Sequence, residues 1–146
     1  CSTEQDIIDS SHNGYEDTGV IHRRKMIIDK KNAIVTIEDA IQLKEEGLKH
    51  DVTMPFHLHP SINDIDFDEH FIKLNVQRGN VQIEPDKVFG SNINIIKGGT
   101  NPLIGWYSPS FYQKQESYAI LMRCVIEKSM TLNTRISVEK NVLNKY

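Results

Sequence analysis

The chain has 146 residues, of which 38% are hydrophobic and 25% are charged, and its formal net charge is -3. A chain of this length and composition is typical of one globular domain with a core of its own. The acidic balance argues against a nucleic-acid-binding face, and the lack of a run of about 18 apolar residues argues against a membrane-spanning helix. We therefore expect no nucleic-acid partner and no membrane partner.

The polar residues 1–18 are predicted to be a tail and a loop, with a short strand at Ile7-Ile8. Residues 19–138 are predicted to be one β-sandwich domain, and residues 139–146 a second polar tail. The N-terminus has neither the basic segment nor the apolar segment of a secretion signal, and it lacks an initiator Met. The simplest interpretation is a piece of a longer parent protein, for which a secreted or periplasmic location stays open.

The strands are predicted from alternating and β-branched runs separated by turn signals. Residues 19–28 and 33–37 form a hairpin around the polar turn at 29–32. Residues 38–47 contain good helix formers, but the stretch is short, and we interpret it as the end of a strand followed by a loop. Cys124 lies in an alternating run and is predicted to be a small buried core residue. Further strands are predicted at 52–60, 70–77, 81–84, 92–97, 118–126 and 130–138.

This spacing of short strands predicts an all-β fold, an antiparallel β-sandwich of about eight to nine strands. The chain contains no GxGxxG, no P-loop, no GxSxG and no HExxH motif. The corresponding dinucleotide, nucleoside triphosphate, serine hydrolase and zinc protease signatures are therefore absent from it.

The basic segment His22-Arg23-Arg24-Lys25 lies on the first strand of the predicted hairpin. Strand alternation places Arg23 and Lys25 on one face and His22 and Arg24 on the other. Guanidinium groups grip carboxylates and sulfates, so all four side chains are candidate substrate-binding residues. The same pattern also fits arginines that serve as structural ion-pair partners and hold a loop to the sheet.

The pair His57 and His59 lies on one face of a predicted strand, at a spacing that suits a shared Zn²⁺ ion. The alternative is two polar histidines on an exposed or interdomain face. Because the pair supplies only two ligands, we predict no bound metal and no other cofactor. A third ligand would have to come from Asp64, Asp66, Asp68 or His70.

An aromatic segment begins at Trp106 and ends at Tyr112. Aromatic faces pack well against the C–H surfaces of sugar rings, so Trp106 and Tyr107 are candidate substrate-binding residues. The competing hypothesis is a loop that closes one end of the sandwich.

Five short segments, in this order and at these distances, resemble the C-terminal β-domain of heparinase II/III-like polysaccharide lyases, over roughly residues 11–138. The segments are His12-Asn13-Gly14-Tyr15, His22-Arg23-Arg24, Ile37-Glu38-Asp39, Phe56-His57-Leu58-His59-Pro60 and Gly105-Trp106-Tyr107-Ser108. The resemblance implies a parent enzyme with an N-terminal helical toroid followed by antiparallel β-sandwich regions. It also implies cleavage of uronic-acid-containing polysaccharides, such as glycosaminoglycans, by β-elimination.

In that family the toroid supplies the main base and acid, and here it would precede residue 1. No catalytic residue is therefore carried over, and His12 and Tyr15 are the candidates for an accessory role. The partners implied are an acidic, uronate-containing polysaccharide and the N-terminal helical toroid of the same polypeptide.

Whether the chain is an enzyme by itself stays open. The leading hypothesis is an accessory lyase domain that is inactive alone. One alternative is a carbohydrate-binding module that uses Arg23, Arg24, Lys25 and the Trp106 loop, with salt-sensitive binding. Others are a purely structural interaction module and, ranked last, a cupin-like metalloenzyme that uses His57 and His59.

Overall fold

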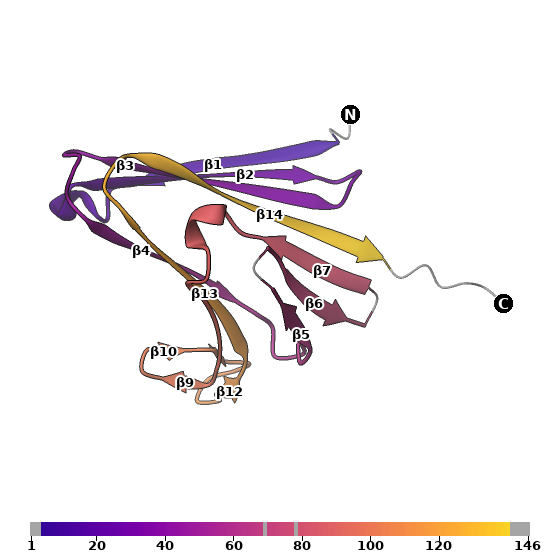
Figure 1. The fold of residues 1–146 in the computed structure, drawn as a ribbon. Coiled ribbons are helices and arrows are strands. Elements are labelled where there is room, and N and C mark those ends of the chain that lie inside the picture. Colours follow the sequence, from indigo (N-terminus) through magenta and orange to yellow (C-terminus); the bar gives the residue numbers. More distant parts are fainter. Residues whose placement is uncertain (1–3, 69, 78, 141–146) are drawn as a thin grey trace.

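The computed structural model describes residues 4–68, 70–77 and 79–140 and consists mainly of antiparallel strands (Figure 1). We call its two main layers the large sheet and the small sheet. The large sheet has seven strands in the order β1 (Gln5–His12), β2 (Val20–Asp29), β3 (Ile34–Leu43), β14 (Met130–Lys140), β7 (Gly79–Glu84), β6 (Ile72–Val76) and β5 (Ile65–Phe67). The small sheet has three strands in the order β4 (His50–His57), β13 (Tyr118–Ile126) and β8 (Ile93–Lys97).

Two short hairpins follow β8 at the lower end of the view in Figure 1. They are formed by β9 (Gly99–Thr100) with β10 (Leu103–Ile104), and by β11 (Trp106–Tyr107) with β12 (Gln115–Glu116). Nine of the described strands have five residues or more. The predicted all-β antiparallel sandwich is confirmed, and the strands of two or three residues lie outside the segments that were predicted to be strands.

The N-terminal segment differs from the prediction of a polar tail. Residues 5–12 form β1, which pairs with β2 from Gln5 opposite Asp29 to His12 opposite His22. Its side chains are all exposed, because β1 is the outermost strand of the large sheet. Propensity and hydrophobicity are weak guides at such an edge. At the other end, β14 continues to Lys140, and residues 141–146 of the second predicted tail lie outside the described residues.

The hairpin of β2 and β3 is confirmed, and β3 extends beyond its predicted end, to Leu43. Ile37, Asp39, Ile41 and Leu43 are buried at every second position. β3 lies between β2 and β14, so its backbone pairs on both sides. Pairing and burial therefore override the helix formers in residues 38–43.

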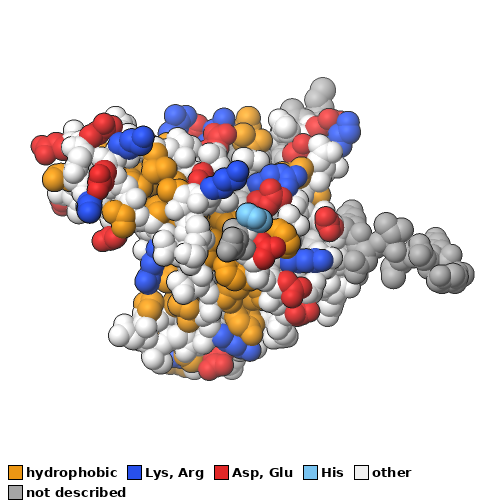
Figure 2. All heavy atoms as spheres, in the orientation of Figure 1, with side chains coloured by type: hydrophobic (Ala, Val, Ile, Leu, Met, Phe, Trp, Pro, Cys, Tyr) orange, Lys and Arg blue, Asp and Glu red, His pale blue; other side chains and the backbone are white. Residues whose placement is uncertain are grey.

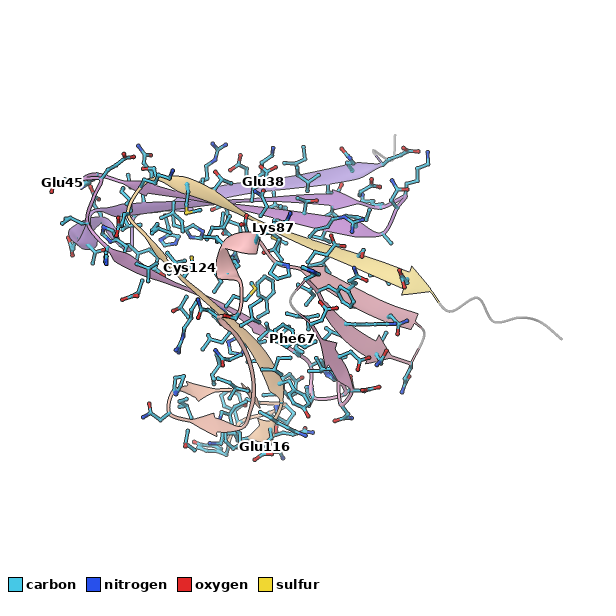
Figure 3. The ribbon with its side chains drawn as sticks, viewed as in Figure 1. Glu38, Glu45, Phe67, Lys87, Glu116 and Cys124 are labelled. Atoms are coloured by element: carbon cyan, nitrogen blue, oxygen red, sulfur yellow. The ribbon has the colours of Figure 1, made fainter. Side chains whose placement is uncertain are left out.

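The core fills the space between the two sheets. Ile72, Ile120, Met122 and Leu132 are fully buried there, and Phe89 joins them from the short 3₁₀ helix η2 (Lys87–Phe89). The prediction of a buried Cys124 is confirmed, since this residue is only 6% exposed and belongs to the same cluster (Figure 3). Burial of such side chains from water is the main favourable term for folding.

The two sheets are unequal in width, and this inequality positions the candidate site. β4 and β13 run obliquely beneath β1, β2 and β3 in Figure 1. β4 is an edge strand of the small sheet and contains Pro55, and an edge strand is one of the places where a sheet accommodates proline. Three strands cannot cover seven, and the residues of the outermost strand β1 are all exposed, so this edge of the large sheet is left uncovered.

Within the described residues, no helix is long and apolar enough to cross a membrane. Figure 2 shows acidic and basic side chains interspersed over one face of the molecule. Hydrophobic side chains are also visible on that face, between the upper and lower parts of the view.

Candidate functional site

A groove of about 710 Å³ lies between the two sheets beside β4. Its volume is in the usual range for small-ligand sites, which is roughly 300–1,000 Å³. One wall comes from β1, β2, β3 and the connection between β1 and β2, and the other from the first residues of β4 and Lys49. The lining residues are His12, Tyr15, Thr18, Val20, His22, Arg24, Asp39, Ile41, Lys49, His50, Asp51, Val52, Thr53, Met54 and Pro55.

Strand register brings the polar side chains of the first wall together. His12 on β1 lies directly opposite His22 on β2, and Arg24 on β2 lies directly opposite Asp39 on β3. Directly opposed residues of antiparallel strands have Cβ atoms roughly 5 Å apart on the same face, and diagonal neighbours are still within reach of long side chains. His22 therefore also reaches Asp39, which lies two residues from its direct partner Ile41.

Asp39 is the buried centre of this wall, with a side chain only 1% exposed. Arg24 donates to it through Nε over 2.7 Å and through Nη2 over 3.0 Å. His22 Nε2 lies 2.6 Å from the same carboxylate oxygen that Arg24 Nε contacts. A buried carboxylate is stable only when it is paired and hydrogen-bonded, and here both requirements are met.

A chain of hydrogen bonds runs from the connection after β1 to Asp39. The Gly14 N–H donates to His12 Nδ1 over 3.2 Å, and His12 Nε2 lies 3.1 Å from His22 Nδ1. In a neutral imidazole one nitrogen accepts and the other donates. Because His12 Nδ1 accepts, His12 Nε2 donates to His22, and His22 Nε2 in turn donates to Asp39. The hydrogen bonds thus assign the tautomers of His12 and His22, and every donor in the series points toward Asp39.

Tyr15 lies at the outer end of this chain of hydrogen bonds. Its ring meets the His12 ring edge to face, with centroids 5.1 Å apart. The connection that carries it turns back through the 3₁₀ helix η1 (Glu16–Thr18), and Gly19 ends that helix at φ 76°. This left-handed conformation is the one that glycine adopts without strain. The predicted accessory residues His12 and Tyr15 are therefore neighbours at the groove.

The predicted basic cluster is divided between the two faces of β2, in agreement with strand alternation. Arg23 points away from the groove and pairs with Asp9 on β1, donating through Nε over 2.8 Å. The hydrogen bond from Arg23 lowers the pKa of Asp9 below its ordinary value, and Asp9 raises the pKa of Arg23. Lys25 faces Glu38 at 3.6 Å. Of the four basic-segment residues, only His22 and Arg24 line the groove.

The histidine pair at the end of β4 has no third metal ligand grouped with it among the described residues. His57 is the last residue of β4, and His59 lies beyond it, hydrogen-bonded to Ser61 Oγ at 2.8 Å. Of the proposed third ligands, Asp64 accepts from Asn75, and Asp68 accepts from the backbone N–H of His70. Within the part of the chain that the structure describes, no three His, Cys, Asp or Glu residues are grouped to hold a metal ion.

The aromatic segment lies away from the groove. Trp106 donates through Nε1 to the carbonyl oxygen of Gly99 over 2.8 Å, and Lys114 Nζ lies 3.6 Å from the Trp106 ring centroid. One face of Trp106 is therefore occupied by a cation. Tyr107 contacts the ring of His59, with centroids 5.3 Å apart. The groove lining along β4 ends at Pro55, whereas Tyr107 contacts His59 beyond the end of that strand, so this aromatic segment is not part of the groove.

The candidate list drawn from the sequence did not include Asp39, although its signal was present. An aspartate in the alternating run Ile37, Asp39, Ile41, Leu43 falls on an apolar face and needs a partner when it is buried. The list also lacked Lys49 and His50, which reach the groove only because β4 packs against the large sheet.

A family model described as heparinase II/III-like, C-terminal, matches residues 2–139. No curated protein sequence gives a significant match. The heparan sulfate lyase HepC from Pedobacter heparinus is similar in structure, with a TM-score of 0.73 at 13% identity, over 97% of this chain and 21% of that one. A heparinase III is similar with a TM-score of 0.71 at 13% identity, over 98% of this chain and 21% of that one. These likenesses show a shared fold, and this chain spans about a fifth of the length of either enzyme.

Proposed function

The chain belongs to the family of heparinase II/III-like C-terminal domains, and from this premise we propose that it is an accessory β-sandwich domain of a lyase that cleaves uronic-acid-containing polysaccharides by β-elimination. Its role is to contact the acidic polysaccharide, and it does not cleave the polysaccharide alone. The structural neighbours are lyases of heparan sulfate, which is such a polysaccharide. Those enzymes are about five times longer, which supports the proposal that the catalytic base and acid belong to a part of the polypeptide outside this domain.

The observation that carries the glycan contact is the way in which Asp39 holds Arg24 in the groove wall. Two of the three guanidinium nitrogens bond to the buried carboxylate, and Nη1 has no protein partner among the described residues. An arginine anchored in this way loses little side-chain entropy when it binds a second oxyanion. A uronate carboxylate or a sulfate ester supplies that oxyanion.

The test combines binding with turnover. We expect the chain to bind heparan sulfate oligosaccharides more weakly as salt rises, and to produce none of the ultraviolet absorbance of an unsaturated uronate. Arg24→Gln should weaken binding, and Arg23→Gln on the opposite face is the matched control. Turnover by the chain alone contradicts the accessory role, and binding that Arg24→Gln leaves unchanged contradicts the assignment of the groove.

A purely structural interaction module is the second candidate, and the loop between β11 and β12 favours it. Phe111 and Tyr112 are almost completely exposed there, and Leu103 on β10 is 74% exposed. Large exposed apolar side chains mark surfaces that pack against other protein parts. This candidate predicts no glycan binding at any ionic strength, so the same titration distinguishes the two functions.

A further inference from the structure

We propose that the groove takes up one proton when it binds an anionic group of a glycan, and that the His12–His22 pair holds this proton. The inference rests on the proposed function, since the anion belongs to the glycan. It adds a coupling between glycan binding and pH at residues that lie on the groove wall.

The resting hydrogen bonds leave one position for the proton. Both carboxylate oxygens of Asp39 and both ring nitrogens of His22 already take part in hydrogen bonds. His12 Nε2 is hydrogen-bonded to His22. His12 Nδ1 accepts only the Gly14 N–H, over 3.2 Å, at the end of the chain farthest from Asp39. A proton that reaches this chain of hydrogen bonds from the groove therefore binds at His12 Nδ1.

The charges around the pair explain why an anion needs this proton. Arg24 and Asp39 neutralise each other, and Lys49 faces Glu127 at 3.8 Å. On the β4 side, Asp51 adds a negative charge. The other titratable groups that line the groove are His50 on β4 and Tyr15 in the connection after β1. Because the resting wall has no net positive charge, an entering oxyanion gains most when an imidazolium forms on the groove wall that also carries Arg24.

The uptake of the proton can be followed atom by atom. Solvent supplies one proton to His12 Nδ1, which then donates to the anion instead of accepting from Gly14. The Gly14 N–H is released and becomes a second donor at the same place. The Asp39 carboxylate, at the far end of the chain of hydrogen bonds, stabilises the positive charge by way of His22. No bond other than N–H and hydrogen bonds is made or broken.

The ligand class is an oxyanion on a sugar, either a uronate carboxylate or a sulfate ester. N–H donors on a groove wall that also carries a guanidinium suit either group, so the chemistry is shared. An unsulfated uronate oligosaccharide, a sulfated oligosaccharide without uronate and inorganic sulfate are the probes that separate the sources.

Calorimetric titration in two buffers of different ionisation enthalpy measures the number of protons taken up for each ligand bound. We expect about one proton with at least one of the two oligosaccharides, and an affinity that falls roughly tenfold for each pH unit of increase while that uptake persists. His12→Gln, at an exposed position outside the core, should abolish the uptake and remove most of the pH dependence. His57→Gln, an exposed histidine at the other end of β4, is the matched control and should leave both unchanged.

Nitrogen NMR of the imidazole rings gives an independent check of the starting state. Both His12 and His22 should carry their hydrogen on Nε2 in the free protein, and His12 should gain a second hydrogen on Nδ1 when the oligosaccharide binds. Glycan binding without proton uptake overturns this inference and leaves the proposed function intact. Binding of no probe at any pH overturns the inference together with the glycan contact, and binding of inorganic sulfate alone overturns the assignment to a sugar.

Discussion

Arg23 and Arg24 are neighbours in sequence, yet they lie on opposite faces of β2 in different surroundings. The Arg23 side chain is 61% exposed and pairs with Asp9 at the outer surface. Arg24 pairs with Asp39, whose side chain is only 1% exposed, and lines a groove. Exposed ion pairs contribute little to stability because water and salt screen them. The comparison shows that the face of the strand, and not the residue type, decides which arginine belongs to a candidate site.

The largest expected effect tests the same rule of alternation on β13. Ile120 faces the core and is fully buried, whereas Val125 faces outward and is 54% exposed. Ile120→Ala should lower the free energy of unfolding by about 4 kcal/mol, because it removes buried surface and leaves a cavity. Val125→Ala should change it by less than about 0.5 kcal/mol. Urea denaturation measures both, and equal losses would mean that β13 does not present these two faces.

The next effect concerns the two carboxylates that hold the arginines. Asp39→Ala should cost about 2 kcal/mol, since it removes the hydrogen-bonded partner of both His22 and Arg24. Asp9→Ala should leave the thermal midpoint close to that of the parent chain, because its pair with Arg23 is exposed. A similar loss in both variants would remove the distinction between the two faces.

A third effect concerns binding. Arg24→Gln should weaken the binding of a uronate oligosaccharide about tenfold, which is the usual scale for one charge-assisted contact. Arg23→Gln should change it less than about twofold at physiological salt, where charges outside the groove are screened. Fluorescence or calorimetric titration at two salt concentrations checks this, and the reverse ranking would place the glycan on the outer face.

The smallest effect is a pH dependence at Cys124. Burial raises the pKa of the Cys124 thiol, and the negative charge of Asp86 adds to the rise. Since the folded state holds this proton more tightly than the unfolded chain, the contribution to stability is complete below the ordinary thiol pKa and is lost as pH rises through the folded value. In a Cys1→Ser background, the stability advantage over Cys124→Ala should therefore shrink from about pH 8 upward. Parallel curves for the two proteins would contradict the expected burial.

Alternation along single strands could be read from the sequence, and with it the all-β fold, the hairpin of β2 and β3, and the opposite faces of Arg23 and Arg24. The strand β1 was largely missed, because an exposed edge strand has no hydrophobic period. His12, Tyr15, His22 and Arg24 were predicted as candidates, although without the carboxylate of Asp39 that connects them. The groove itself depends on the unequal widths of two sheets and on β4 reaching the large sheet, and neither property is local in the sequence.

The edge position of Pro55 on β4 has a consequence for the behaviour of the protein in concentrated solution. Edge strands invite pairing with strands of other molecules, which leads to aggregation. Pro55 offers no N–H to an incoming strand, and it lies where β4 borders the groove. The same border that leaves room for a ligand therefore interrupts the template for uncontrolled self-association.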